Sequence, residues 1–156
     1  MNSTLRKLRF GSMILFLIVI AVAAAQNMAA NLQEVEIPIT DVELGCHPQW
    51  RNPLIIDDNQ ALQKALDEGS TNYCKLERNL KIDFQKYTLI LLTEFADCQA
   101  MIYPRVTKDT AKKLYVVTLE EKYGGCRGMT GHSFSFLVEK LPPDYSVHFA
   151  ETKRSK

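Results

Sequence analysis

The sequence lacks every short motif that by itself marks a catalytic or metal centre. It contains no C-x-x-C pair, no H-E-x-x-H and no G-x-S-x-G, and no glycine-rich loop follows a predicted strand and opens a helix. Zinc needs ligands that are paired closely on a turn, whereas the four cysteines here are more than twenty residues apart. These absences argue against zinc-knuckle, thioredoxin-like and other metal sites. We therefore predict no metal, no cofactor and no catalytic residue.

The sequence also has no excess of either charge. Its 19 basic residues nearly balance its 18 acidic residues, and the short basic segment TKRSK at the C-terminus is too small to change that balance. A near-neutral surface gives no electrostatic reason to expect nucleic acid or an anionic membrane as a partner. We see no internal repeat and no low-complexity tract. The composition favours a globular domain with a protein partner.

The N-terminus has the parts of a secretory signal peptide. A basic segment without acidic residues precedes the apolar run GSMILFLIVIAVAAA, and Ala23-Ala24-Ala25 matches an A-x-A cleavage site. We predict a signal peptide over 1–25 and an exported protein, periplasmic or secreted, without stable membrane insertion after cleavage. The alternative is an uncleaved membrane anchor, because no charged residue occurs between Gly11 and Glu34. The strongly apolar core is, however, shorter than the ~20 residues that a spanning helix needs.

The predicted mature chain of about 130 residues suits one domain with its own core. We place a flexible leader at 26–33, a single disulfide-bonded domain at 34–150 and a basic tail at 151–156. Four cysteines in an exported chain predict two disulfides, for which three connectivities are possible. The four are Cys46, Cys74, Cys98 and Cys126.

One helix is predicted, in the segment DDNQALQKALDEG. Either Asp57 or Asp58 can cap its free N–H groups, and Leu62 and Leu66 lie four residues apart on one apolar stripe. We expect Gly69 to supply the left-handed residue that ends the helix. A short amphipathic helix of this kind covers a sheet more often than it binds a ligand.

The remaining elements are predicted strands. QEVEIPI alternates and contains Pro38, which indicates an edge strand, and the apolar run TLILLT indicates a central strand. QAMIYPRV and KKLYVVTLEE form a hairpin around the polar turn TKDTA, and SFSFLVEKL and PPDYSVHF complete the set. The predicted fold class is α+β, mainly antiparallel β sheet or sandwich with one short covering helix.

The hairpin suggests how the cysteines pair. If it turns near Asp109 and Thr110, Cys98 and Cys126 fall at the same open end, and a bulge in the second strand could bring them together. The disulfides would then be Cys98–Cys126 and Cys46–Cys74, with the second closing the helical segment against the sheet.

The segment KYGGCRGMTGHSF holds a cysteine and a histidine among four glycines. A nucleophilic Cys126 would need a histidine base within reach, yet His132 lies only six residues away in the same loop, and no cysteine is left unpaired. We instead predict that loop 123–132 contacts a partner through Tyr123, Arg127 and Met129, since aromatic residues and arginine are enriched at interface centres. The alternative is that the glycines only permit tight turns.

Three segments, NPLIIDDNQALQKALDE, LKIDFQKYTLILLTEF and FSFLVEKLPPDYSVHF, resemble the PrcB-like C-terminal domain of protease-complex subunits over about residues 53–149. Where that family tends to have Gly-Gly-Tyr at the start of the hairpin, this chain reads DCQAMIY and keeps an aromatic residue, Tyr103. The resemblance implies an accessory subunit that associates with an exported protease and performs no chemistry itself. The alternative is a secreted protease inhibitor that presents loop 123–132 to a protease cleft.

Overall fold

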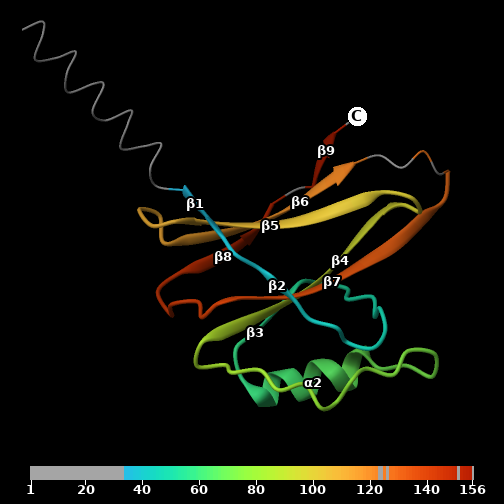
Figure 1. Ribbon diagram of the computed structural model, residues 1–156, viewed down its shortest axis with the longest axis horizontal. Helices are drawn as coiled ribbons and strands as arrows, with labels where there is room; N and C mark the ends of the chain where they lie inside the picture. The colour runs from blue at the N-terminus through green and yellow to red at the C-terminus, as the bar shows by residue number, and fades with distance from the viewer. Residues whose placement is uncertain (1–33, 123–124, 126, 151, 156) are drawn as a thin grey trace, which may run out of the picture. The chain divides into compact units, whose positions relative to one another are not determined.

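The structure, a computed structural model, describes residues 34–122, 125, 127–150 and 152–155 (Figure 1). The chain divides into two compact units, Met1–Val35 and Glu36–Lys156. The predicted signal peptide, its cleavage after Ala25 and the leader 26–33 lie outside the described residues. Within the described part, no helix is both long and apolar enough to cross a membrane.

The described chain is mostly β, with two sheets and one short helix, α2 (Asn59–Gly69). Sheet A has the order β1-β5-β6-β8, with β9 also paired to β6, and its strands are β1 (Glu34–Ile37), β5 (Met101–Asp109), β6 (Leu114–Lys122), β8 (Ser146–Phe149) and β9 (Lys153–Ser155). Sheet B has the order β2-β7-β4-β3, with strands β2 (Thr40–Asp41), β7 (Met129–Glu139), β4 (Tyr87–Asp97) and β3 (Leu54–Ile56). The edge position of β1 and the inner position of β4 confirm the predictions for these segments.

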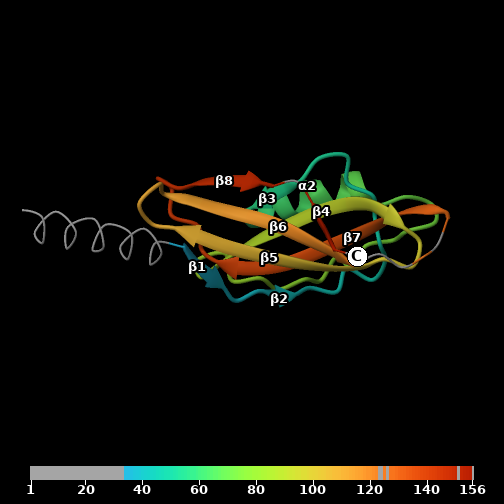
Figure 2. The same ribbon diagram turned by 90° about the horizontal axis from the view of Figure 1, so that it is seen from above.

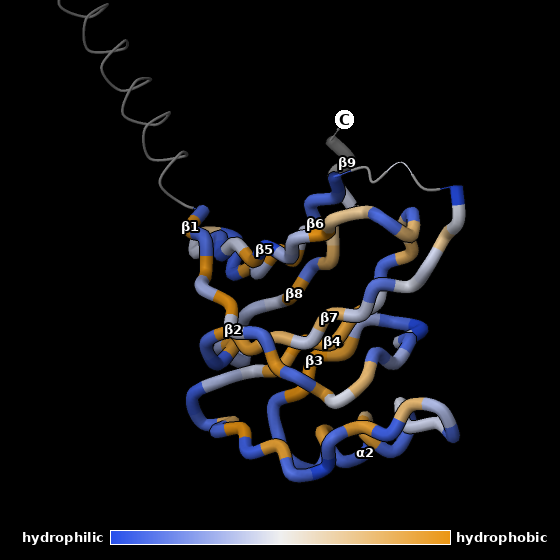
Figure 3. The backbone as a smooth tube through the Cα atoms, turned by 45° about the vertical axis from the view of Figure 1, so that its right-hand side comes forward, coloured by the Kyte–Doolittle hydropathy of each residue, from blue (hydrophilic) through white to orange (hydrophobic). Residues whose placement is uncertain are grey.

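Strand β4 is apolar from Leu89 to Leu92 because both of its faces are covered. Ile90 and Leu92 belong to a core cluster that draws residues from both sheets. Leu89 and Leu91 point the other way, into a second cluster beneath α2. Figure 3 shows the hydrophobic segments following β3, β4 and β7, and Figure 2 shows the β5–β6 hairpin lying over β4 and β7. A strand buried on both faces needs a continuous apolar run, and TLILLT is that run.

Helix α2 is capped and packed largely as its sequence predicts. Asp58 is the N-cap, and its carboxylate accepts a hydrogen bond from the Ala61 N–H at 2.7 Å. Leu62 and Leu66 are both 1% exposed and pack into the second cluster.

The prediction for Gly69 was wrong. Among the described glycines only Gly45 and Gly125 have positive φ, and the helix is capped by Ser70 in extended conformation. A Cβ at position 69 would lie 2.4 Å from Cη2 of Trp50, so glycine is required by a close side-chain contact and not by a left-handed backbone.

Strands β4 to β7 form one long, bent hairpin. In sheet B the pairing runs to Asp97 opposite Met129, and in sheet A it resumes at Met101 opposite Lys122. Between these pairs the first arm has three residues and the second has six, so the second arm carries the extra residues that the sequence led us to expect there. The hairpin closes with Asp109 opposite Leu114, slightly later than the predicted turn.

Two further segments differ from their predictions. Residues Met129 to His132, expected within a glycine-rich loop, are part of β7 and pair with β4. Their partner strand extends far enough to complete the ladder, which overrides the local preference of glycine for turns. The basic tail 151–156 contributes β9, which pairs in parallel with β6, as β8 also does.

Candidate functional site

Arg127 and Met129, two of the predicted contact residues, lie where the long hairpin bends. Met129 is 66% exposed at the start of β7, and Arg127 is also exposed. The backbone N–H of Cys98 donates to the Gly128 carbonyl at 3.0 Å, which holds the two arms of the bend together. Tyr123 lies outside the described residues, so the structure places two of the three predicted contact residues.

The predicted disulfide between Cys46 and Cys74 is present, with an S–S distance of 2.09 Å and the Cα atoms 5.6 Å apart. Both cysteines pack against the cluster beneath α2. Cys126 lies outside the described residues, so the Cys98–Cys126 bridge stays a prediction.

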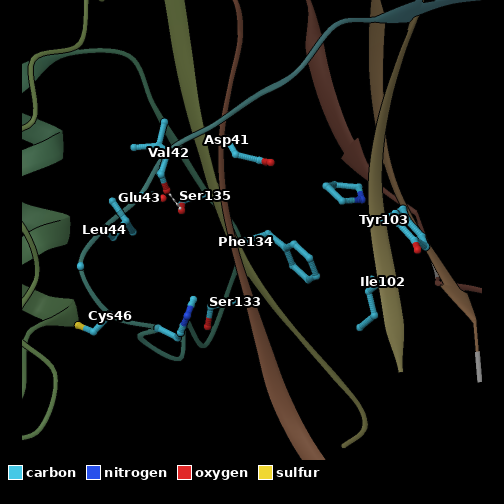
Figure 4. A pocket seen from close by; sticks show the side chains of 13 residues that line it. Asp41, Val42, Glu43, Leu44, Cys46, Ile102, Tyr103, Ser133, Phe134 and Ser135 are labelled. Atoms are coloured by element: carbon cyan, nitrogen blue, oxygen red, sulfur yellow. Dashed lines mark hydrogen bonds between the residues drawn. The ribbon is translucent and has the colours of Figure 1, made fainter. Parts of the chain in front are cut away.

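A groove of about 540 Å³ lies between strands β5 and β7 of the hairpin (Figure 4). One side is formed by the end of β2, the following loop 42–47 and β7, and the other side by β5. Its lining residues are Asp41, Val42, Glu43, Leu44, Gly45, Cys46, His47, Ile102, Tyr103, Pro104, Ser133, Phe134 and Ser135. This groove is the best candidate for a functional site in the described part of the chain.

The groove has an apolar floor. Phe134 and Ile102 are both partly buried and pack against the core between the sheets. Figure 4 shows the Phe134 ring pointing from β7 towards β5, where Ile102 and Tyr103 lie. Tyr103 is 47% exposed, so an aromatic side chain is available beside the groove. An apolar floor with a few polar groups at its edge is typical of a binding site.

The rim of the groove is acidic. Asp41 and Glu43 are exposed, and the lining contains no lysine or arginine. Neither carboxylate forms an ion pair with another described residue. Asp41 pairs with Phe136 across the β2–β7 ladder, so its side chain leaves the sheet on the same face as Phe134.

The serine hydroxyls in the groove hold the loop in place. Ser135 Oγ donates to the Val42 carbonyl at 2.6 Å, and Ser133 Oγ donates to the Pro48 carbonyl. His132, the histidine nearest to Cys126 in the sequence, has its Nε2 3.1 Å from the Asp97 carbonyl oxygen. These polar groups therefore have structural partners within the domain.

A cluster of shifted pKa values lies where residues of the two sheets meet. The ion pair with Lys108 and the hydrogen bond from Tyr115 lower the pKa of Glu139, while the Glu139 carboxylate raises the pKa of Lys108. Burial raises the pKa of Tyr115, whose hydroxyl donates to Glu139 at 2.6 Å. Lys108 and Tyr115 belong to sheet A and Glu139 to sheet B, so the cluster links the two sheets.

Sequence reasoning missed the groove because three distant segments form it. One signal was present: Pro104 stands inside a predicted strand, and proline in a strand indicates an edge or an interrupted ladder. In the described residues, no group of three histidine, cysteine or acidic side chains is arranged to hold a metal ion. No protein-family model, no curated protein and no solved structure matches this chain.

Proposed function

We propose that this protein is an exported, non-catalytic interaction module that associates with a protease of the cell envelope or the secreted fraction. The observation that carries the proposal is the groove, which combines an apolar floor with an acidic rim. Its serine hydroxyls donate hydrogen bonds to the loop that forms one wall. The disulfide between Cys46 and Cys74 supports export, because such bonds persist in oxidising compartments. The PrcB-like resemblance supports the protease as partner.

The contact surface of the module would include the bend of the hairpin. Met129 is a large apolar side chain in solvent, and Phe95, on the paired strand, is 53% exposed. Met101 and Tyr103 add two more exposed side chains at the start of β5, with the Tyr103 hydroxyl 3.6 Å from the Met101 sulfur. Exposed aromatic and methionine side chains of this kind are enriched in protein interfaces. We also interpret the two sheets as a sandwich, which would give these residues a rigid support.

The alternative is a secreted protease inhibitor. Because Met129–His132 pair with β4, only the shorter segment 123–128 would then be presented to the protease cleft. The mature protein, tagged at its C-terminus, would be used to capture partners from the exporting cell, and any captured protease would be assayed with and without a stoichiometric amount of the module. An accessory subunit co-purifies and leaves the protease active, whereas an inhibitor lowers its activity. Capture of no protease would contradict both.

The contact residues are tested with a double substitution, Arg127→Ala with Met129→Ala. Arg51 and Ile55 are an exposed arginine and an exposed apolar residue elsewhere on the domain, so replacing both with alanine provides a matched control. We expect the first pair to weaken capture about tenfold or more if a hot spot is removed, and the control to leave it unchanged. Equal binding by both variants would place the contact surface elsewhere.

A further inference from the structure

We infer that the groove binds an extended segment of the partner as an additional strand along β7, with a lysine or arginine side chain of that segment beside Asp41 and Glu43. This inference rests on the proposed function, because it identifies the part of a protein partner that the module would recognise. It follows from the open edge of β7, the apolar floor and the charge of the rim.

The edge of β7 is covered for only part of its length. Strand β2 pairs with Leu137 and Phe136, and the Val42 N–H donates to the Ser135 carbonyl at 2.8 Å. Backbone groups of alternate residues point to the same side of an antiparallel strand, so those of Ser133 and Gly131 also face away from β4. No backbone hydrogen bond to a described residue is made by these two on that side. The groove opens at Ser133, next to this free edge.

The loop after β2 makes no backbone hydrogen bond to Ser133 or Gly131, although the Pro48 carbonyl accepts from Ser133 Oγ and the Gln49 side chain lies against Gly131. Gly45 has φ of 82°, a left-handed conformation that turns the chain, and the Leu44 carbonyl accepts from the Glu77 N–H at 2.9 Å. One residue later the disulfide joins Cys46 to Cys74. Three successive restraints therefore keep the loop as a wall of the groove. Beyond Ser135 the described chain makes no further backbone hydrogen bond to this edge of β7, and we place the strand of the partner there.

The side-chain pattern of the guest follows from strand geometry. Alternate side chains of an added strand point to opposite faces, so every second residue would face the groove on the side of Phe134. The floor made by Phe134 and Ile102 suits a branched apolar side chain there. Asp41 lies on the same face, and the lining has no lysine or arginine. A cationic side chain two residues from the apolar one would therefore complement the rim, and an anionic one would be repelled. Strand addition of this kind uses main-chain hydrogen bonds for affinity and side-chain pockets for specificity.

The test uses short labelled peptides and the mature protein. The probe is a fluorescein-labelled peptide of about seven residues, the length of an ordinary strand, in which threonine alternates with valine and the central valine is replaced by lysine. A second peptide has glutamate in place of the lysine. Fluorescence anisotropy at about 0.05 M and 0.5 M salt gives the affinities. We expect the lysine peptide to bind at least about fivefold more tightly at low salt, and this advantage to shrink at high salt.

Two sets of variants locate the binding. Asp41→Asn with Glu43→Gln should remove the preference for lysine, while the equal charge change Asp67→Asn with Glu68→Gln, on α2, should leave it intact. Ser133→Pro removes the open N–H, whereas Ser133→Ala is its matched control, because both lose the hydroxyl bond to Pro48. We expect about a tenfold loss for the proline variant relative to the alanine variant.

A measurement on the peptide itself covers the case in which Ser133→Pro fails to fold. Methylation of the backbone nitrogens on one edge of the peptide should abolish binding, and methylation on the other edge should not. The inference is overturned if the lysine and glutamate peptides bind equally, or if the peptides methylated on the two edges both bind as tightly as the unmethylated peptide. A dimer of the module that closes the groove, detected by light scattering, would also overturn it.

The outcomes separate this inference from the proposed function. If the double variant at Asp41 and Glu43 still captures the protease as tightly as the parent does, the protease association stands and the groove is not its site. If the lysine peptide binds as expected but no protease is captured, the strand-addition site stands and the class of partner is wrong.

Discussion

Replacement of Gly69 by alanine should destabilise the domain although alanine is the better helix former. A Cβ at this position would lie 2.4 Å and 2.7 Å from Cη2 and Cζ3 of Trp50, and 2.9 Å from Cδ1 of Leu76. Trp50 is 7% exposed and sits among the leucines beneath α2, so its ring has little room to move. Alanine gains ~1 kcal/mol in a helix relative to glycine, whereas overpacking a core costs ~1–3 kcal/mol. We expect a net loss of up to ~2 kcal/mol in the free energy of unfolding.

A double-mutant cycle tests the cause of this loss. Phenylalanine lacks Cη2 and Cζ3, so in a Trp50→Phe background the Gly69→Ala change should be neutral or stabilising by up to ~1 kcal/mol. Trp50→Phe also changes the stability by itself, in part because it removes the indole N–H, which is buried without a hydrogen-bond partner among the described residues. Urea unfolding followed by circular dichroism measures all four proteins, because Trp50 is the only tryptophan and fluorescence would be lost in two of them. Equal destabilisation by Gly69→Ala in both backgrounds would refute the steric explanation.

Three further predictions concern bonds that join distant segments. Replacing Cys46 and Cys74 by serine, which opens a bridge between residues 28 apart, should cost ~3–4 kcal/mol in denaturant unfolding. The lowered pKa of Glu139 means that its pairing stabilises the fold when the pH is above the ordinary pKa of 4.5. The difference in unfolding free energy between the parent and Glu139→Gln should therefore shrink as the pH falls through and below that value. The raised pKa of Lys108 gives the opposite pH dependence. Its ion pair with Glu139 contributes fully to stability below the ordinary pKa of 10.5, and the contribution is lost as the pH rises above that value. Alkaline unfolding curves of Lys108→Met should therefore lack this loss of stability.

The elements whose signals are local were predictable from the sequence. The run TLILLT marked β4 because a strand covered on both faces must be apolar at successive residues. Asp58 could be proposed as a cap because the free N–H groups of a helix lie within a few residues of the capping side chain. The Cys46–Cys74 bridge needed more, and its prediction depended on an export signal together with the expected position of the hairpin.

Features set by tertiary contacts were not predictable in the same way. Gly69 follows the last turn of a helix, where a left-handed glycine is common, yet the residue that requires it is Trp50 on another segment. The start of β7 contains Gly131 and was expected to be a loop, but β4 provides a partner along its whole length. The pattern in one strand does not state how far its neighbour extends, so the loop was predicted too long.

The groove combines both kinds of feature, and this explains why binding and stability should be separable in this protein. Its floor is part of the core, since Phe134 packs against residues of both sheets, and loss of that ring would affect folding as well as binding. Its rim is different, because Asp41 and Glu43 are exposed and form no ion pair with a described residue, so changing them should leave stability within about 0.5 kcal/mol of the parent. Charge at the rim can therefore determine which segment enters without altering the fold that holds the groove open. The test is the unfolding curve of the Asp41→Asn, Glu43→Gln variant. A loss of unfolding free energy several times larger than that limit would show that the two carboxylates support the loop, and that they do not serve only to select a partner.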